Sequence, residues 1–173
     1  MLTLILGGAR SGKSALAERL AIDSGREVAY VATAQALDGE MASRIAHHRE
    51  RRPTEWLCVE EPLALADTLR RHARESRFVL VDCLTLWLSN LLGLAEGSRF
   101  AAEREAFLDT VSMLPGDIVF VSNEVGLGIT PLGELTRRFV DEAGRLHQTL
   151  AQRCDRVVFV AAGLPLILKG TLP

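Results

Sequence analysis

The sequence predicts an α/β fold, in which helices cover both faces of a mainly parallel sheet. Three observations predict it. Short runs of consecutive apolar residues recur along the chain, as in parallel strands that are buried on both faces. Between these runs lie longer stretches in which apolar residues recur every three or four positions, the period of a helix. A glycine-rich turn at residues 7–14 joins the first apolar run to the first such stretch. Strands that alternate with helices in this way build β-α-β units.

The elements follow in order from these patterns. We expect strands at residues 2–6, 27–32, 56–59, 78–82, 117–121 and 156–161, and the apolar residues 164–168 allow an edge strand. We expect helices at residues 13–24, 38–52, 62–74, 84–94, 100–113 and 133–153.

Turn and capping residues define the expected ends of these helices. Gly25 is placed to end the first helix, and Asp38 is a candidate N-cap of the second. Pro53 stops that second helix, because proline lacks an N–H and its ring obstructs the preceding turn. Pro62 is expected at the first position of the third helix, where its missing N–H costs nothing. A polar turn at residues 96–98 separates the fourth helix from the fifth.

Length and composition predict one domain that spans residues 1–173. The formal net charge of −2 argues against a nucleic-acid-binding protein, which would need a basic excess. The start of the chain lacks a basic region, so we expect no signal peptide. The longest apolar run, residues 157–168, contains Gly163 and Pro165 and is too short to span a bilayer.

Cysteine usage favours a reducing compartment. Cys58, Cys83 and Cys154 are far apart, odd in number and form no C-x-x-C pair. This pattern is typical of reduced thiols rather than of disulfides or a zinc site. We therefore expect a cytoplasmic protein.

The glycine-rich turn fits the phosphate-loop pattern G-x-x-x-x-G-K-[ST]. Its residues are Gly7, Gly8, Ala9, Arg10, Ser11, Gly12, Lys13 and Ser14. Glycines let backbone N–H groups surround the phosphates of a nucleotide, Lys13 adds a positive charge, and the Ser14 hydroxyl can ligate Mg²⁺. The alternative is a turn that binds nothing. An apolar strand before it and an amphipathic helix after it favour nucleotide binding.

The carboxyl ends of the other strands carry polar residues, which should meet the phosphate loop at one edge of the sheet. Thr33, Asp82, Asn123 and Glu124 stand at these ends. Asp82 has two interpretations: it holds Mg²⁺ opposite Ser14, or it caps the next helix. The glycine-containing loop 123–131 is either a segment that approaches the substrate or an ordinary connection, and sequence physics alone does not separate the two.

A second candidate cluster lies on the expected helix 38–52. His48 shares a helix face or turn with Arg44, Arg51 and Arg52, and His47 precedes it. Neighbouring positive charge keeps an imidazole neutral and nucleophilic near pH 7, and the arginines could clamp phosphates. The alternative is a solvated basic face with two surface histidines, which composition alone favours.

Two other classes of nucleotide-binding protein fit the sequence less well. A GTPase switch protein should carry N-K-x-D, which the sequence lacks, and a RecA-like motor should be larger or carry DNA-binding loops. Two alternatives stay open on these residues: a phosphate-loop kinase for another small metabolite, and a nucleotide-gated binding protein without activity.

With these motifs laid out, the chain resembles the bifunctional adenosylcobinamide kinase / adenosylcobinamide-phosphate guanylyltransferase family nearly end to end. The phosphate loop is generic, but two other blocks in this order are specific. The matching blocks are GGARSGKS (7–14), YVAT (30–33), LDGEMASRIAHHRERRP (37–53), VDCLTLWLSNLL (81–92), VSNEVGLGITP (121–131), RRFVDEAGRLHQTLA (137–151) and GLPLILKG (163–170). The specific ones are HHRERRP and NEVGLGITP.

The resemblance implies a two-step activity of adenosylcobalamin biosynthesis. The enzyme phosphorylates adenosylcobinamide with ATP or GTP. It then transfers GMP from GTP, through a GMP–histidine intermediate, to give adenosylcobinamide-GDP and pyrophosphate. The histidine that carries GMP in the family precedes the Arg of the H-R-x-x-R-P block, which is His48 here; His47 is the fallback. This reverses the preference for a solvated histidine face.

The resemblance also implies further site residues and an assembly. Catalytic roles fall to His48 and Lys13, and Ser14 and Asp82 would hold Mg²⁺. Beyond the phosphate loop, the nucleotide contacts would be Ala32, Thr33, Ala34, Arg49, Glu50, Arg51, Arg52, Glu60 and Asp82. A carboxylate at Glu60 suits guanine, because it can accept from N1–H and N2–H₂. Thr130 and His147 depart from the usual Val and Asn of the family. The family forms homotrimers whose subunits have a RecA-like P-loop NTPase sheet.

Overall fold

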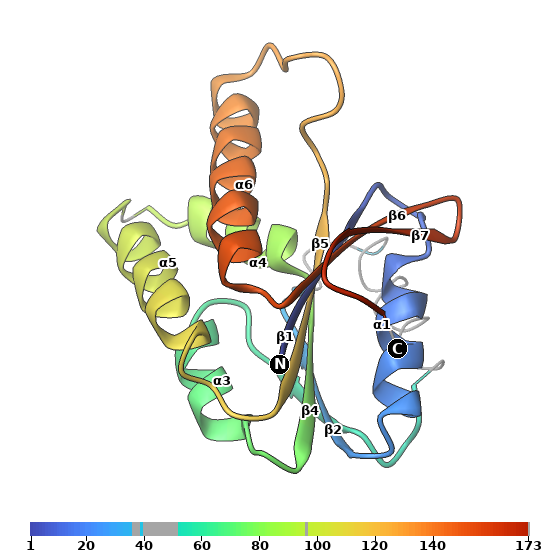
Figure 1. Cartoon of the computed structure of the whole chain (residues 1–173). Helices are drawn as coiled ribbons and strands as arrows, with labels where there is room; N and C mark the ends of the chain where they lie inside the picture. Colours follow the sequence, from blue (N-terminus) through green and yellow to red (C-terminus); the bar gives the residue numbers. More distant parts are fainter. Residues whose placement is uncertain (36–38, 40–51, 96, 173) are drawn as a thin grey trace.

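The chain folds around a single sheet (Figure 1). The computed structural model describes residues 1–35, 39, 52–95 and 97–172. The sheet has seven strands in the order β3-β2-β4-β5-β1-β6-β7, and only β7 runs antiparallel to its neighbour. The strands are β1 (Leu2–Gly7), β2 (Glu27–Ala32), β3 (Leu57–Glu60), β4 (Arg77–Asp82), β5 (Asp117–Asn123), β6 (Arg156–Ala161) and β7 (Leu164–Lys169). The described helices are α1 (Lys13–Asp23), α3 (Leu65–His72), α4 (Leu84–Leu92), α5 (Gly97–Val111) and α6 (Glu134–Arg153).

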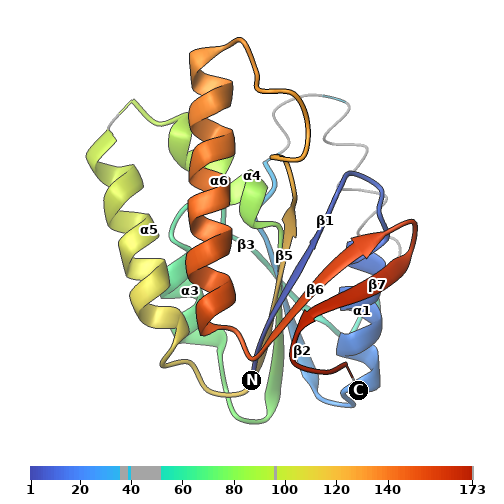
Figure 2. The same ribbon diagram turned by 45° about the horizontal axis from the view of Figure 1, so that its top comes forward.

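Helices cover both faces of this sheet, as predicted. α1 lies on one face, and α3, α4, α5 and α6 lie on the other (Figures 1 and 2). The alternation of side chains along a strand divides the core accordingly. On β1, Leu4 and Leu6 belong to the cluster under the four helices, whereas Ile5 belongs to the cluster under α1. The central strands are therefore apolar at nearly every position, because both of their faces are covered.

An aromatic chain forms the middle of the larger core. The Trp87 and Phe107 ring centroids are 5.0 Å apart, and Phe107 meets Phe120 edge-on at 5.4 Å. The Trp87 Nε1–H donates to the carbonyl of Leu63 (2.8 Å), so this buried indole has a partner for its one donor. α4, α5 and β5 are thereby packed together through three side chains.

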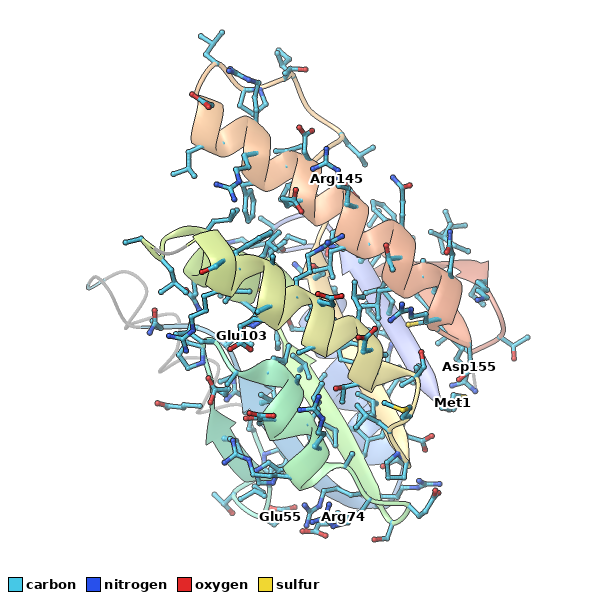
Figure 3. All side chains as sticks on the ribbon, turned by 90° about the vertical axis from the view of Figure 1, so that its left-hand side faces the viewer. Met1, Glu55, Arg74, Glu103, Arg145 and Asp155 are labelled. Atoms are coloured by element: carbon cyan, nitrogen blue, oxygen red, sulfur yellow. The ribbon has the colours of Figure 1, made fainter. Side chains whose placement is uncertain are left out.

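The first strand is also fixed at the edge opposite the phosphate loop. The Leu2 N–H donates to Asp155 Oδ2 (2.7 Å), and Figure 3 shows Met1 beside Asp155 at this end of the sheet. The outward sides of the helices carry charge: Arg145 on α6 pairs with Glu142 at 2.5 Å. Within the described residues, no helix is long and apolar enough to cross a membrane.

Several predicted ends need correction, while the edge strand is confirmed as β7. α3 does not begin at Pro62 but at Leu65. The Glu61 carboxylate accepts the N–H groups of Leu63 and Ala64 (2.9 and 2.8 Å), and these bonds stabilise a turn ahead of the helix.

Other boundaries also differ; α4, for instance, ends at Leu92 rather than at residue 94. α5 begins at Gly97, so Gly97 and Ser98 of the predicted polar turn belong to the helix. β5 continues to Asn123 because Asn123 still pairs with Gly7 of β1. The predicted helix 38–52 lies almost wholly outside the described residues.

The aromatic chain makes a testable contribution to stability. Replacing Trp87 by alanine should lower the free energy of unfolding by about 3–5 kcal/mol, because it leaves a cavity and removes the indole's hydrogen bond to the Leu63 carbonyl. Urea unfolding followed by circular dichroism measures this. Met113→Ala is the control: Met113 is 75% exposed, so its replacement should change stability by less than about 0.5 kcal/mol. Equal losses in the two variants would contradict the assignment of Trp87 to the core.

Candidate nucleotide-binding site

The strand order brings the expected polar strand ends to one edge of the sheet. β2, β4, β5 and β1 are consecutive neighbours. In register, Ala32 lies opposite Asp82, and Gly7 lies opposite Asn123. The residues that follow these strands therefore stand side by side around the phosphate loop.

The phosphate loop follows β1 and turns into α1. A Cβ on Gly7 would lie 2.5 Å from both Ser11 Oγ and the Val160 carbonyl, so no other residue fits without displacement. Arg10 (φ 55°) and Gly12 (φ 96°) adopt left-handed backbone conformations, which curl the loop. α1 begins at Lys13 without a side-chain cap. Its first N–H groups can therefore bind an anion.

Lys13 crosses this loop. Its Nζ donates to the carbonyl of Gly8 at 3.0 Å, and its side chain is buried. Burial lowers the pKa of Lys13, and the Asp82 carboxylate opposes this shift. Phosphate oxygens within the loop would offer the ammonium further acceptors and stabilise its charged form.

Asp82 faces the phosphate loop rather than the next helix. The N-cap residue of α4 is Cys83, and this helix end has no side-chain cap, so the capping interpretation does not hold in this structure. The Asp82 carboxylate instead interacts electrostatically with Lys13 and with the Tyr30 hydroxyl. Burial and the charge of Asp82 raise the pKa of Tyr30 well above its usual value, which keeps the phenol a donor.

The donor set fits Mg²⁺. Ser14 in the first turn of α1 and Asp82 at the end of β4 offer oxygen ligands, which Mg²⁺ prefers. Among the described residues, no group of three or more His, Cys, Asp or Glu is arranged to hold a metal. A magnesium ion here would therefore take most of its ligands from water and from the phosphates of the nucleotide.

Thr33 is placed differently from the expectation. Its side chain is fully buried, and its hydroxyl donates to the Cys83 carbonyl (2.7 Å) and accepts the Cys83 N–H (2.9 Å). The hydroxyl therefore joins the ends of β2 and β4 and is not directed to the open edge. Ala32 and Ala34 on either side are half-buried.

Asn90 supports this junction, and sequence reasoning missed it. Its Nδ2 donates to the carbonyls of Thr33 (2.8 Å) and Pro62 (3.2 Å), so α4 holds the ends of β2 and β3. A signal existed, because Asn90 is the only amide side chain in the mainly apolar helix LTLWLSNLL.

Part of the H-R-x-x-R-P block is described. The Arg52 guanidinium carbon lies 3.5 Å from the centre of the Tyr30 ring, and Trp56 stacks with the same ring at 6.4 Å. Glu60 ends β3 opposite Ala32. The predicted residues His47, His48, Arg49, Glu50 and Arg51 lie outside the described residues.

A buried polar chain supports the end of β5, and sequence reasoning did not anticipate it. Ser122 Oγ lies 2.7 Å from His147 Nε2, and His147 Nδ1 lies 3.9 Å from Glu124 Oε2. The Glu124 N–H donates to the Gly7 carbonyl at 3.0 Å, so this chain reaches the phosphate loop. Burial lowers the pKa of His147, an effect that the Glu124 carboxylate opposes.

Sequence comparisons find close relatives over the whole length. A model of the family described as cobinamide kinase / cobinamide phosphate guanyltransferase matches residues 3–168. The chain is 64% identical over 170 residues to the bifunctional adenosylcobalamin biosynthesis protein CobP of Pseudomonas aeruginosa, covering 98% of each protein. It is 38% identical over 182 residues to CobU of Escherichia coli, a protein of the same description, covering 98% of this chain and all of the relative.

Solved structures support the fold. The RadB recombinase matches with a TM-score of 0.51 and 19% identity, covering 91% of this chain and 73% of the recombinase. A Pyrococcus horikoshii OT3 protein matches with a TM-score of 0.54 and 11% identity, covering 99% and 87% of the two chains. The predicted RecA-like P-loop NTPase fold is confirmed.

The buried histidine predicts a pH effect on stability. Because the folded chain holds His147 neutral below its ordinary pKa of 6.5, the unfolded chain binds more protons in that range. The free energy of unfolding should therefore keep its full value above about pH 6.5 and decrease as the pH drops towards the lowered pKa of His147. His147→Asn should flatten this slope, measured by urea unfolding at successive pH values.

His72 provides the control for this experiment. Burial and nearby arginines also lower its pKa, but it lies on α3, far from Glu124 in the sequence. In His72→Gln, the free energy of unfolding should still fall with decreasing pH, because His147 is unchanged in this variant. An unchanged slope in His147→Asn would contradict the neutral, buried state of His147.

Proposed function

Because the chain belongs to the cobinamide kinase / cobinamide phosphate guanyltransferase family, we propose that it phosphorylates adenosylcobinamide and then guanylylates the product. The chain is an enzyme of this family. One observation carries the proposal: the phosphate loop and Asp82 converge at one sheet edge in a chain that the family matches from residue 3 to residue 168. The small-molecule substrates are adenosylcobinamide, GTP and ATP.

In the kinase step, the γ-phosphate of ATP or GTP passes to a hydroxyl of the corrinoid side arm. The reaction depends on positioning and on charge neutralisation. The N–H groups of the loop and of the first turn of α1 bind the phosphates, and Lys13 is placed across the same loop. Ser14 and Asp82 would hold Mg²⁺, which supplies further charge neutralisation when bound.

In the guanylyltransferase step, a histidine nitrogen bonds to the α-phosphorus of GTP while the bond to pyrophosphate breaks. The corrinoid phosphate then takes the GMP and releases the histidine. Covalent catalysis divides one transfer into two easier ones. We assign His48 to this role by its place in the H-R-x-x-R-P block. The packing of Arg52 on Tyr30, a ring that interacts electrostatically with Asp82, supports the assignment because it holds the end of that block near the nucleotide edge.

Further nucleotide contacts are proposed for Ala32, Ala34, Glu60 and the arginines from Arg49 to Arg52. Glu60 would accept hydrogen bonds from guanine, and its place opposite Ala32 at the end of β3 supports this. For Thr33, the hydroxyl and the N–H already bond the backbone of Cys83 and Asp82, so a nucleotide contact would use its carbonyl oxygen or van der Waals packing.

We also propose a cytoplasmic homotrimer. All three cysteines are free thiols, which supports a reducing compartment. Every residue of the edge strand β7 is exposed, including Leu164, Leu166, Ile167 and Leu168. A second exposed apolar segment contains Leu127 (81% exposed), Ile129 (97%) and Leu132 (97%). Apolar surfaces of this kind support self-association, and the number of subunits rests on the family resemblance.

Labelling with GTP tests the covalent step. Incubation with Mg²⁺ and α-labelled GTP should leave label on the denatured protein, labile to acid and stable to base, as a phosphoramidate is. His48→Ala should abolish the label and guanylyl transfer but keep cobinamide phosphorylation, because its ring serves only the second step. His47→Ala is the matched control and should keep the label. Loss of label in His47→Ala alone would assign the role to His47 instead of His48. An unlabelled wild-type protein would contradict the guanylyltransferase proposal.

Lys13 should be needed in both steps. Lys13→Ala should lower both rates by about a hundredfold or more, since one nucleotide site serves both reactions and loses its main positive charge. Separate assays of cobinamide phosphorylation and of GMP transfer measure this. Arg19→Ala removes an exposed cation from the same helix and should leave both rates near those of the wild type. Loss of only one activity in Lys13→Ala would mean that the steps use different sites.

A further inference from the structure

The tip of the β6–β7 hairpin touches the phosphate loop. A two-residue turn, Ala162 (φ 52°) and Gly163 (φ 78°), joins Ala161 to its partner Leu164. Two successive left-handed residues form the tight turn that suits a twisted hairpin. The N–H of Gly163 points out of this turn and donates to the carbonyl of Ser11 at 2.8 Å. A hydrogen bond thus links residues 152 positions apart.

This bond orients one peptide group of the phosphate loop. In a planar trans peptide the C=O and the following N–H point in opposite directions. Since the Ser11 carbonyl is held towards the hairpin, the Gly12 N–H must point away from it. That direction leaves this donor for the phosphates, together with the first N–H groups of α1.

The packing leaves little freedom for another arrangement. A Cβ on Gly12 would lie 3.1 Å from the Gly163 Cα, so the two backbones approach closely. A Cβ on Gly7 would meet the Val160 carbonyl of β6 at 2.5 Å. The loop is therefore packed against β6 and its turn through backbone atoms at both ends.

We propose that Gly163 is a positioning residue of the nucleotide site: the hairpin tip orients the Gly12 amide and so sets the affinity for the diphosphate part of a nucleotide. The inference rests on the proposed function, because it assumes that the loop binds nucleotide phosphates. It adds that a residue near the end of the chain, outside the phosphate-loop motif, controls one donor of that loop.

The test compares two glycines with the same backbone conformation. Gly163 (φ 78°) and Gly25 (φ 63°) are both left-handed, and an added Cβ would meet nothing within 4 Å at either. Alanine therefore strains both turns in the same way. Of the two glycines, Gly163 contacts the phosphate loop, whereas Gly25 lies at the end of α1 that is remote from this loop.

The readout is the dissociation constant of GDP with Mg²⁺, measured by calorimetry, with the melting temperature measured in parallel. Gly163→Ala should weaken GDP binding about tenfold, the loss expected when a donor to a charged group is displaced. Gly25→Ala should change GDP binding less than twofold, although it should lower the melting temperature by about as much as Gly163→Ala does. Gly163→Asn should restore most of the affinity, since asparagine tolerates the left-handed conformation.

Two outcomes separate failure of this inference from failure of the proposed function. If the wild type binds GDP and the two alanine variants bind it equally, the positioning role of Gly163 is wrong. If the wild type does not bind GDP, the proposed function itself fails. Should Gly163→Ala not fold, hydrogen exchange of the wild type decides: the Gly163 amide should be protected, and exchange at the rate of an unbonded amide would overturn the inference.

Discussion

The constraint on which the rest of the structure depends is the backbone support of the phosphate loop by the two strands that flank β1. From the β5 side, the Glu124 N–H bonds the Gly7 carbonyl, and from the β6 side the Gly163 N–H bonds the Ser11 carbonyl. A loop held through its carbonyls turns its own N–H groups the other way. In the proposed function, this support would present the donors before a nucleotide arrives and so lower the ordering cost of binding.

The charged groups at this edge depend on one another. Lys13 is buried, which disfavours its charge, and the Asp82 carboxylate compensates for part of that cost. Asp82 also interacts electrostatically with Tyr30, whose ring carries Arg52 on its face. A line of interactions thus runs from the phosphate loop to Arg52, the first described residue of the H-R-x-x-R-P block, and it joins the site of the first proposed step to the segment proposed for the second.

The sequence predicted the strands better than the helix ends. Strands β2 and β6 have their predicted bounds, because continuous apolar runs are hard to misplace when both faces of the sheet are buried. The start of α3 was wrong by three residues, because the Glu61 side chain satisfies the N–H groups of Leu63 and Ala64 ahead of the helix. The start of α5 was wrong because Gly97 and Ser98 suit a helix N-terminus as well as a turn. Such local competition is decided by single hydrogen bonds that a residue pattern does not contain.

By itself, the sequence determined the fold class, the phosphate loop, the convergence of strand ends and the family, because each depends on local spacing or on contiguous motifs. Only the tertiary structure decided that Thr33 joins two strands, that Asn90 holds their ends, and that His147 reaches Ser122. It also showed that the N–H groups of Glu124 and Gly163 support the phosphate loop. The partners of these groups lie 25 or more residues away along the chain, and their hydrogen bonds arise only when the sheet brings distant segments together. The local pattern of the loop predicts what it binds, and the neighbouring strands hold two of its carbonyls.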